Sequence, residues 1–428
     1  MRQEVRSGIV TTLAAVKVLL VGSGGREHAL AWKLTQAPSL TELHVAPGNP
    51  GIATLADCHP VVADDSEGLL GLARSLGVDL VVIGPEAPLV AGVADELRHA
   101  GIAVFGPGRG AAAIEGSKRL AKDVMRTAGV PTAATLPIAR APCVVKADGL
   151  AAGKGVVVCR TPAELDAGLR AVSAFGGEIV IEELLEGPEL SLFALCDGQH
   201  AVALAPAQDF KRAHDGDLGP NTGGMGSYAP VPRMGADEVE ELLDRVHRLV
   251  IAELVVRGTP FVGLLYAGLM ITADGPKVLE FNCRFGDPET QSVLPLLDGD
   301  LVEALAAATV GELRGVALGR RPGAAVTVVL AASDYPASGD RGSPIEGIQA
   351  AEATGALVFH AGTALRGGRV TTNGGRILDV TGLGETIAAA RAAAYAAADL
   401  ISFPGARRRD DIALAAAEGR WLGLESRQ

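Results

Sequence analysis

Short apolar segments alternate with helical patterns through the first 106 residues, and this alternation is the strongest constraint on the fold. The apolar segments are residues 16–22, 43–46, 79–84 and 102–106, each of strand length. Helical patterns such as GVADELRHA lie between them. Strands that alternate with helices predict a parallel sheet with crossover helices. Ligands bind such sheets beyond the carboxyl ends of the strands, and these ends carry GSGGREH, APGNPG, GPEAPL and GPGRG.

The rest of the chain changes pattern twice, which predicts a multidomain α/β and α+β protein. A chain of 428 residues is long enough for about three domains. A compact, strand-rich stretch follows the parallel sheet, RRPGA resembles a linker, and an Ala-rich helix is expected near the carboxyl end. We expect a disordered extension, an N-terminal α/β domain, a central domain with a small lid, and a C-terminal α+β domain, at 1–15, 16–116, 117–320 (lid 132–189) and 321–422.

The stretch VVKADGLAAGKGVVV (144–158) predicts a β-hairpin whose loop binds phosphate. Glycines let the backbone approach an anion closely, and Lys146 and Lys154 neutralise it. A Walker A loop is excluded: three residues separate Gly149 from Gly153, Gly155 follows the lysine, and the loop joins two strands. The alternative interpretation is an ordinary solvated hairpin with two surface lysines.

The stretch GSGGREHALA follows a strand and opens a helix, as a dinucleotide fingerprint does, but it lacks the third glycine. A pattern that begins at Gly22 needs glycine at position 27, where Glu27 stands. The second strand also ends without an acidic residue for a ribose hydroxyl. A nicotinamide cofactor is therefore not expected, although Gly24 and Gly25 at the helix N-terminus could hold a phosphate.

The stretch KVLEFNCRFGDPETQ (277–291) predicts a metal-binding strand. Residues two apart share one face of a strand, so Glu280, Asn282 and Arg284 are expected to point together, while Val278 and Phe281 fall on opposite faces. A carboxylate beside an amide suits Mg²⁺, which takes further ligands from phosphate and water. A solvent-facing polar stripe on an edge strand is the alternative.

The segment 207–230 is long, irregular and rich in glycine and charge, and we interpret it as a wall of the site. Its candidate side chains are Asp209, Lys211, Arg212 and Asn221. A mobile surface loop is the alternative.

Charge and cysteine content narrow the classes of partner. The net charge of −12 argues against nucleic acid or a membrane surface, which require basic faces. The five cysteines lack metal-ligand spacing, which is typical of a reducing compartment. No apolar run is long enough to cross a bilayer. We therefore expect a cytoplasmic protein, a monomer or weak homodimer, that acts on small molecules.

These motifs together resemble the ATP-grasp superfamily and, within it, the phosphoribosylamine–glycine ligase family. The matching stretches occur in family order and include GSGGREHALAW, GPEAPL, VVKADGLAAGKGV, GPNTGGMGSYAP, EFNCRFGDPETQ and TNGGR. The resemblance implies that glycine is joined to 5-phosphoribosylamine while ATP is converted to ADP and phosphate. Glycyl phosphate would be the intermediate, and the protein's part would be positioning and charge stabilisation.

The resemblance also implies a role for each matching residue. The ATP phosphates, the mobile flap, the adenine hinge, the ribose contact and the nucleotide wall would be formed by Lys118, Lys146, Gly149, Gly153, Lys154, Gly155, Glu182, Glu183, Leu184, Leu185, Glu189, Arg212 and Asn221. Mg²⁺ (or Mn²⁺) would be held by Glu280 and Asn282. The acyl phosphate and glycine would face Arg284 and Asp287, with Lys146 also taking part in catalysis. Phosphoribosylamine would contact Gly24, Gly25, Arg26, Asn49 and Glu86.

The chain departs from the family pattern in three places. The lid is shortened between Pro131 and Cys143, Phe210 replaces the usual histidine, and Pro188 stands where glutamate is common. We expect a competent ligase with a reduced lid. Two alternatives remain: another ATP-grasp ligase or a bicarbonate-using carboxylase, and a nucleotide-binding protein that has lost turnover.

Overall fold

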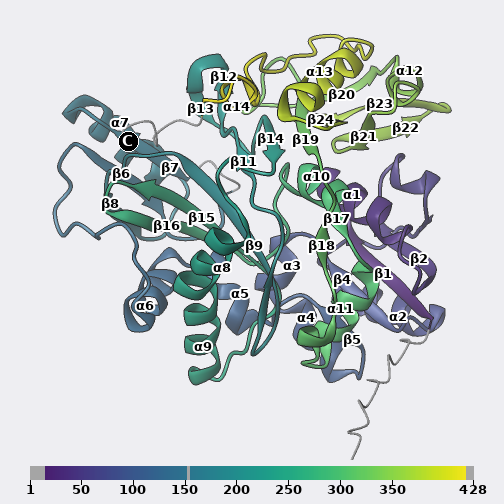
Figure 1. The fold of residues 1–428 in the computed structure, drawn as a ribbon, viewed down its shortest axis with the longest axis horizontal. Helices are drawn as coiled ribbons and strands as arrows, with labels where there is room; N and C mark the ends of the chain where they lie inside the picture. The colour runs from purple at the N-terminus through teal and green to yellow at the C-terminus, as the bar shows by residue number, and fades with distance from the viewer. Residues whose placement is uncertain (1–14, 152–154, 421–428) are drawn as a thin grey trace, which may run out of the picture.

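The computed structural model describes residues 15–151 and 155–420 (Figure 1). The expected extension at 1–15 therefore lies almost wholly outside the described residues, as do Gly153 and Lys154 of the hairpin loop. Within the described part, no helix is both long and apolar enough to cross a membrane.

The N-terminal unit is the parallel sheet that the sequence predicted. Its five strands run in the order β3-β2-β1-β4-β5, and every neighbouring pair is parallel. The strands are β1 (Val16–Gly22), β2 (Leu40–Pro47), β3 (Asp57–Cys58), β4 (Leu80–Ile83) and β5 (Ala103–Phe105), and the connecting helices are α1 (Gly25–Leu34), α2 (Ser66–Leu76), α3 (Glu86–Ala91) and α4 (Val93–His99). The helices α1 and α3 begin at the carboxyl ends of β1 and β4, so their first residues lie at the edge where a ligand is expected.

The central unit combines a lid sheet with a larger antiparallel sheet. The lid sheet has the order β7-β6-β8, with β6 (Cys143–Ala147), β7 (Val156–Cys159), β8 (Ile179–Glu183) and helix α7 (Pro162–Ser173). The larger sheet has the order β10-β9-β15-β16, with β9 (Glu189–Asp197), β10 (Ala201–Ala203), β15 (Val262–Thr272) and β16 (Gly275–Asn282). Both predicted hairpins, β6–β7 and β15–β16, are antiparallel pairs. The helices of this unit are α5 (Arg109–Gly116), α6 (Lys118–Ala128), α8 (Ala236–Leu242), α9 (Arg248–Val256), α10 (Thr290–Val293) and α11 (Leu301–Thr309).

The segment 207–230, expected to be irregular, contains four short strands. They are β11 (Gln208–Asp209), β12 (Arg212–His214), β13 (Leu218–Asn221) and β14 (Gly226–Ala229). The strands β12 and β13 form a hairpin, while β11 and β14 join a sheet with the carboxyl-terminal part of the chain. The prediction differed because these strands are too short to show an apolar period, while their buried backbone groups still need hydrogen-bond partners.

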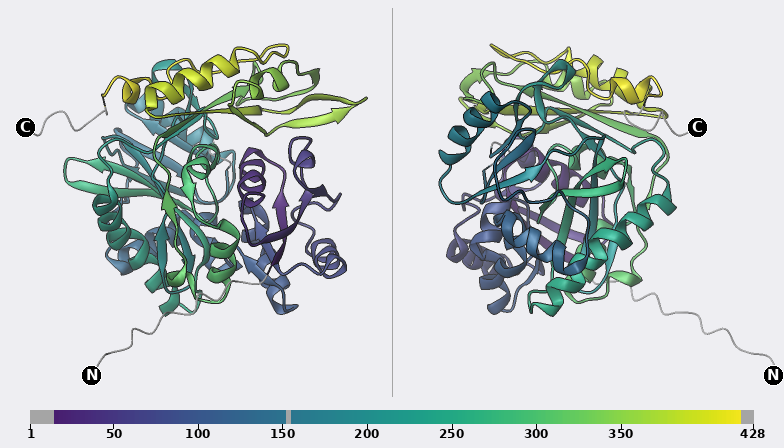
Figure 2. Two further views of the ribbon diagram at one scale, coloured as in Figure 1. Left: turned by 45° about the vertical axis from the view of Figure 1, so that its right-hand side comes forward. Right: turned by 90° about the vertical axis from the view of Figure 1, so that its left-hand side faces the viewer.

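The C-terminal unit shares its main sheet with the central unit and lies across the top of the molecule (Figure 2). The order of this sheet is β11-β14-β19-β24-β21, with β19 (Ala324–Ala331), β21 (Leu357–His360) and β24 (Arg376–Gly384). A smaller sheet holds β20 (Asp340–Pro344), β22 (Thr363–Arg366) and β23 (Arg369–Gly374). The remaining elements are β17 (Leu297–Asp298), β18 (Gly319–Arg320), α12 (Ile348–Glu352), α13 (Ile387–Ala398) and α14 (Leu414–Ala417).

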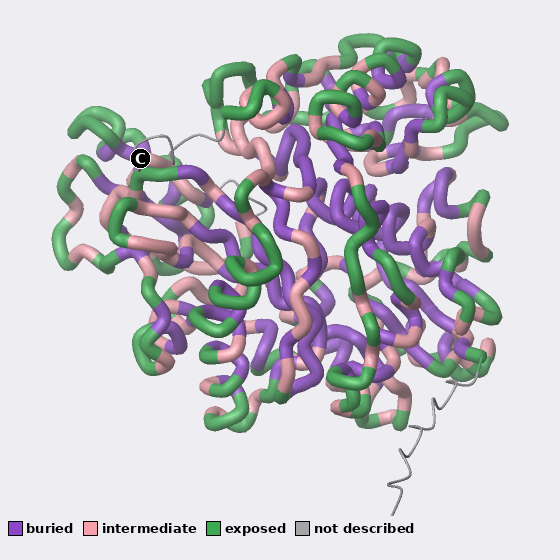
Figure 3. The backbone as a smooth tube through the Cα atoms, viewed as in Figure 1, coloured by how far each residue is buried: buried purple, intermediate pink, exposed green. Residues whose placement is uncertain are grey.

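The buried backbone is concentrated where the three units meet (Figure 3). One hydrophobic cluster contains Leu19 of the first sheet, Leu265 of the central sheet and Val326 of the C-terminal sheet. The lid has a small separate cluster that includes Val145 and Leu165. The lid is therefore tied to the rest of the molecule mainly through polar contacts at the site, and not through the shared core.

The Ala-rich helix α13 approaches the C-terminal sheet closely because Gly382 of β24 lacks a side chain. A β-carbon at this position would collide with backbone atoms of Ala390 and Ala394. Gly71 in α2 is the opposite case, because nothing lies within 4 Å of a β-carbon built there.

We expect Gly382→Ala to lower the free energy of unfolding by about 2 kcal/mol or more, because α13 must move away from the sheet. Gly71→Ala should raise it by about 0.5–1 kcal/mol through helix propensity. Urea unfolding followed by circular dichroism measures both. Equal effects of the two substitutions would contradict the close packing of α13.

Candidate active site

A cavity of about 890 Å³ lies between the lid and the central sheet. This volume suits a nucleotide-sized ligand. The predicted site residues that line it come from the N-terminal and central units and are Arg26, Glu86, Lys118, Lys146, Gly149, Gly155, Glu182, Glu183, Leu184, Leu185, Glu189, Arg212, Asn221, Glu280, Asn282, Arg284 and Asp287. The structure thus brings together residues that are up to 261 positions apart in the sequence.

Two lysines in this cavity share one buried carboxylate. Glu182 of β8 lies 2.7 Å from Nζ of Lys146 on β6 and 2.9 Å from Nζ of Lys122 on α6. Glu182 is only 2% exposed, so this triad is shielded from water. Lys146 also donates to the carbonyl of Leu279 (3.0 Å), which joins the lid strand to β16. The side chain of Glu182 therefore organises the two lysines, in addition to any hinge role of its backbone. Lys122 had no predicted role.

Lys118 begins α6 directly beneath the flap. Its backbone N–H donates to Asp148 Oδ1 (2.6 Å), and its Nζ donates to the carbonyl of Gly149 (3.0 Å). Burial lowers the pKa of Lys118, and Glu280 acts in the opposite direction. On the other side of the flap, Asn221 donates from Nδ2 to the carbonyl of Val156 (3.3 Å). The described ends of the β6–β7 loop are thus held from both sides.

The predicted hinge and ribose carboxylates are both paired with lysines. Glu183 accepts a hydrogen bond from the N–H of Ala134 (2.9 Å) and lies 3.0 Å from Nζ of Lys277. The hydrogen bond from Ala134 is the main cause that lowers the pKa of Glu183. Glu189 accepts from Nζ of Lys211 at 2.7 Å. Arg212 lies next along the chain and donates to the carbonyl of Gly219 (2.8 Å).

Glu280 and Asn282 lie at the end of β16 and face this group of cations. Burial raises the pKa of Glu280, but Lys211, Lys146 and Lys118 outweigh it, so the net pKa is lowered. The Nζ of Lys211 is 3.9 Å from Glu280 Oε1. An ionised carboxylate next to an amide oxygen fits Mg²⁺. No group of three or more His, Cys, Asp or Glu residues within the described ranges forms a metal cage, so phosphate and water would complete the coordination.

Arg284 is held between two carboxylates. Its Nε lies 3.2 Å from Glu86 Oε2, and its Nη2 lies 3.4 Å from Glu115 Oε1. It also donates to Asn282 Oδ1 (3.2 Å), which places its guanidinium beside the candidate metal pair. Burial raises the pKa of Glu86, but Arg284 and Arg26 together lower it to about 2. Burial raises the pKa of Glu115, which sequence analysis did not assign to the site.

A second cavity, of about 490 Å³, lies at the carboxyl edge of the parallel sheet. Gly24, Gly25 and Asn49 line it, whereas the other two predicted substrate residues, Arg26 and Glu86, line the first cavity. The side chain of Asn49 is engaged by the fold: Nδ2 donates to the carbonyls of Ser23 and His360, and Oδ1 accepts from two backbone N–H groups. Asn49 therefore shapes the cavity wall.

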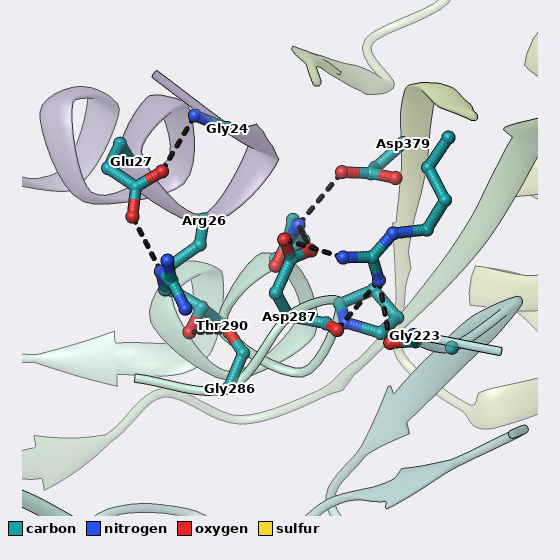
Figure 4. Close-up of polar contacts among 12 residues, drawn as sticks. Gly24, Arg26, Glu27, Gly223, Gly286, Asp287, Thr290 and Asp379 are labelled. Atoms are coloured by element: carbon teal, nitrogen blue, oxygen red, sulfur yellow. Dashed lines mark hydrogen bonds and ion pairs between the residues drawn. The ribbon is translucent and has the colours of Figure 1, made fainter. Parts of the chain in front are cut away.

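Glu27 explains why the glycine-rich turn departs from a dinucleotide fingerprint. Its carboxylate accepts from the N–H of Gly24 (2.7 Å) and from Nε of Arg26 (2.5 Å), as Figure 4 shows. A β-carbon at Gly22 or Gly84 would collide with this side chain. The two glycines thus make room for a buried carboxylate at the position where the fingerprint has its third glycine.

The two cavities meet at Asp287 and Arg376, which line both. The guanidinium of Arg376 lies 2.8 Å from Asp287 Oδ2 and donates to the backbone carbonyls of Asp287 and Gly223, both at 2.7 Å (Figure 4). Gln291 donates from Nε2 to Asp287 Oδ1 and to Asp379 Oδ2, both at 2.8 Å. Burial raises the pKa of Asp379, and Asp287 adds to this effect.

Sequence analysis did not assign Arg376, Gln291 or Asp379. Arg376 ends the motif TNGGR and Gln291 ends the motif EFNCRFGDPETQ. Both motifs were recognised in the sequence, but neither of these two residues was given a function. Asp379 lies in an apolar strand and shows no comparable signal.

The antiparallel sheet, the lid and the charged cavity between them define the class of ATP-grasp enzymes. The sequence matches the family models of phosphoribosylglycinamide synthetase: the N domain over residues 16–115, the ATP-grasp (A) domain over 116–290 and the C domain over 325–415. The chain belongs to this family and is an ATP-dependent ligase.

Similar proteins of the same family support this assignment along nearly the whole chain. The phosphoribosylamine–glycine ligase of Streptomyces coelicolor is 51% identical, with 94% of this chain and 100% of the relative covered. That of Brucella melitensis is 49% identical, with 94% and 99% covered. The crystal structure of phosphoribosylamine–glycine ligase from Thermotoga maritima is 35% identical with a TM-score of 0.77, and the match covers 93% of this chain and 100% of that one.

The carboxylase alternative shares the fold alone. The biotin carboxylase domain of the Hydrogenobacter thermophilus 2-oxoglutarate carboxylase is 19% identical with a TM-score of 0.65. Its crystals contain magnesium ADP and bicarbonate. The ligase relatives are much more similar in sequence, so the carboxylase interpretation is not favoured.

We expect Glu182→Gln to lower the free energy of unfolding by about 3 kcal/mol, because two buried lysines lose their shared counter-charge. Glu178→Gln, an exposed carboxylate just before the same strand, should change it by less than about 1 kcal/mol. Denaturant unfolding measures both. Similar effects for the two variants would show that the triad is not the important contact.

The pairing of Glu86 with Arg284 and Arg26 predicts a pH-dependent contribution to stability. Because the folded-state pKa of Glu86 is depressed to about 2 from its ordinary 4.5, the contribution is fully present above pH 4.5 and is lost as the pH falls towards 2. Glu86→Gln should therefore destabilise the protein at pH 7, and the difference from the unmodified chain should shrink at pH 3.5. Unfolding at both pH values measures this, with the exposed Glu67→Gln as the control. A difference that stays constant with pH would contradict it.

Proposed function

We propose that the chain joins glycine to 5-phosphoribosylamine and forms glycinamide ribonucleotide, a step of purine biosynthesis. A glycine carboxylate oxygen attacks the γ-phosphorus of ATP, and ADP leaves. The amine nitrogen of phosphoribosylamine then attacks the carbonyl carbon of glycyl phosphate. The carbon–oxygen bond to phosphate breaks, the new amide forms, and the amine gives up one proton.

The observation that carries this proposal is the junction of the two cavities at Asp287 and Arg376. The first cavity has the cations and the acid–amide pair that phosphoryl transfer needs. The second cavity opens at the N-terminus of α1, a helix of 10 residues, where backbone N–H groups favour a phosphate such as that of phosphoribosylamine. An acyl phosphate made in the first cavity therefore lies next to an amine held in the second.

The nucleotide lies in the first cavity in this proposal. Lys118 and Lys146 bind its phosphates, the segment from Glu182 to Leu185 borders the base, and Glu189 binds the ribose. Gly149 and Gly155 form the ends of the flap, and Arg212 and Asn221 form the opposite wall. Lys122 acts indirectly, through Glu182.

Glu280 and Asn282 would hold the divalent cation. When bound, the cation neutralises charge on the phosphate oxygens. Arg284 contributes a second, fixed positive charge on the same side of the cavity. The carboxylates Glu86 and Glu115 keep this guanidinium oriented, so it needs no rearrangement when charge develops on the transferring phosphoryl group. Arg26 supports Glu86 from the other side, at 3.7 Å.

Asp287, fixed by Arg376, faces the amine in this proposal and is the candidate to receive its proton.

Purified protein should release ADP only when ATP, Mg²⁺, glycine and phosphoribosylamine are all present. Omitting each substrate in turn, with ADP measured by a coupled assay, tests the proposal. ADP release that depends on bicarbonate and not on glycine would overturn it.

Glu280→Gln should lower kcat by about 100-fold or more, because the carboxylate beside the transferred phosphoryl group is lost. The exposed Glu240→Gln on α8 should leave kcat unchanged. A normal kcat in Glu280→Gln would exclude Glu280 as a metal ligand.

A further inference from the structure

The ammonium group of glycine needs a negatively charged partner, and Asp287, assigned above to face glycine, is already paired with Arg376. In the proposed reaction the glycine carboxylate points towards the γ-phosphate, so the ammonium group points away from the metal pair. Burying an ammonium group is costly unless an oppositely charged, hydrogen-bonding group receives it. A carboxylate that lines the first cavity and is not already neutralised by the protein would meet this need.

Among the described carboxylates that line this cavity, Glu289 alone has no lysine, arginine or histidine nitrogen within 4.0 Å. The others are each paired: Glu86 and Glu115 with Arg284, Glu182 with Lys122 and Lys146, Glu183 with Lys277, Glu189, Asp209 and Glu280 with Lys211, Asp217 with Arg409, and Asp287 with Arg376. Glu289 is 3% exposed. In the described residues, its carboxylate is therefore buried with no basic side chain in direct ion-pair contact.

Among the described residues, the side-chain hydrogen-bond donors to Glu289 are two hydroxyl groups. Tyr266 donates to Glu289 Oε1 at 2.8 Å, and Ser191 donates to the same oxygen at 3.5 Å. The two hydroxyls also lie 2.9 Å from each other. Both contacts use Oε1, so no described donor is hydrogen-bonded to Oε2. A β-carbon at Gly286 would lie 2.6 Å from Oε2, so glycine at that position keeps the space beside this oxygen open.

Glu289 also lies close in the chain to the residue where the two cavities meet. It lines the first cavity and follows Asp287, which lines both cavities, by two residues. Its charge acts on both Arg284, beside the metal pair, and Arg376, beside the second cavity. In the proposed reaction glycine lies between these two arginines, because its carboxylate reacts first with ATP in the first cavity and then with the amine from the second cavity.

We propose that Glu289 binds the ammonium group of glycine, with Tyr266 and Ser191 as positioning residues that fix its carboxylate. This inference rests on the proposed function and adds the amino-acid subsite to it. Glu289 then selects an amino acid over a carboxylic acid that lacks the ammonium group.

The test uses Glu289→Gln, which keeps the size of the side chain and an oxygen for Tyr266 but removes the charge. Steady-state ADP release gives KM for glycine and for ATP. The same assay with glycolate, in which a hydroxyl replaces the ammonium group, gives the ratio of kcat/KM for glycine to that for glycolate. Tyr266→Phe is the matched control, because it removes the hydroxyl and keeps the charge on Glu289. Thermal unfolding of each variant checks its folding.

Glu289→Gln should raise KM for glycine by about 10- to 100-fold and leave KM for ATP within about threefold. The preference for glycine over glycolate should fall by a similar factor, whereas Tyr266→Phe should largely keep it. An unchanged KM for glycine would overturn the proposal. So would a general loss of activity with the glycine preference intact, because that result indicates a purely structural role. A failure of the proposed function would give a different result, because ADP release by the unmodified chain would then not depend on glycine.

Discussion

The ion pair between Arg376 and Asp287 is the contact on which the two-cavity arrangement depends. Arg376 begins β24 in the C-terminal unit, Asp287 follows β16, and the same guanidinium reaches the carbonyl of Gly223. One side chain therefore joins three segments that are distant in sequence. The contact is a charge-assisted hydrogen bond between two partly buried side chains, which is stronger than a hydrogen bond between neutral groups. The ion pair thus adds a charged link, at the wall between the two cavities, to the hydrophobic cluster that the three units share.

The site balances its own charges before any substrate binds. Lys122 and Lys146 share Glu182, Arg284 lies between Glu86 and Glu115, and Lys211 is near three carboxylates. Such pairing offsets the desolvation cost of burying these cations. It also orients them, so that binding energy is not consumed in arranging side chains. Glu289 is the exception among the described cavity carboxylates, and an exception in a balanced site indicates a ligand group of opposite charge.

The sequence predicted the parts of the fold that depend on local pattern. The parallel strands and the two hairpins follow from apolar period and turn chemistry. The family resemblance then placed most of the cavity residues. It could not show that the side chain of Asn49 is engaged by backbone groups, because one of its partners, the carbonyl of His360, is 311 residues away. The resemblance likewise gave no role to Arg376, because the position of Arg376 between the two cavities depends on tertiary contacts.

The strand β16 shows why simple alternation is not sufficient. Gly268 pairs with Glu280 and Leu269 with Val278, so the register shifts at Leu279. Val278 and Phe281, expected on opposite faces, are both buried in the same hydrophobic cluster. Glu280 and Asn282 still line the cavity together, as predicted. A bulge of this kind re-aims side chains next to a site, and a sequence pattern alone does not reveal it.

The three departures from the family pattern affect packing more than charge. The centres of the Phe210 and Tyr228 rings are 6.3 Å apart. The guanidinium of Arg409 lies 5.0 Å from the centre of the Phe210 ring. Arg409 is 1% exposed and is paired with Asp217 and Asp411. A neutral aromatic face next to this buried guanidinium is more favourable than a histidine ring that could itself become positively charged. Pro188 contributes through its backbone, because its carbonyl accepts from the N–H of Ile271 (2.9 Å).

The shortened lid keeps its own apolar cluster and its lysine–glutamate triad. The charged contacts that the proposed reaction uses are thus present together with the three changes, which favours a working ligase over a protein that has lost turnover.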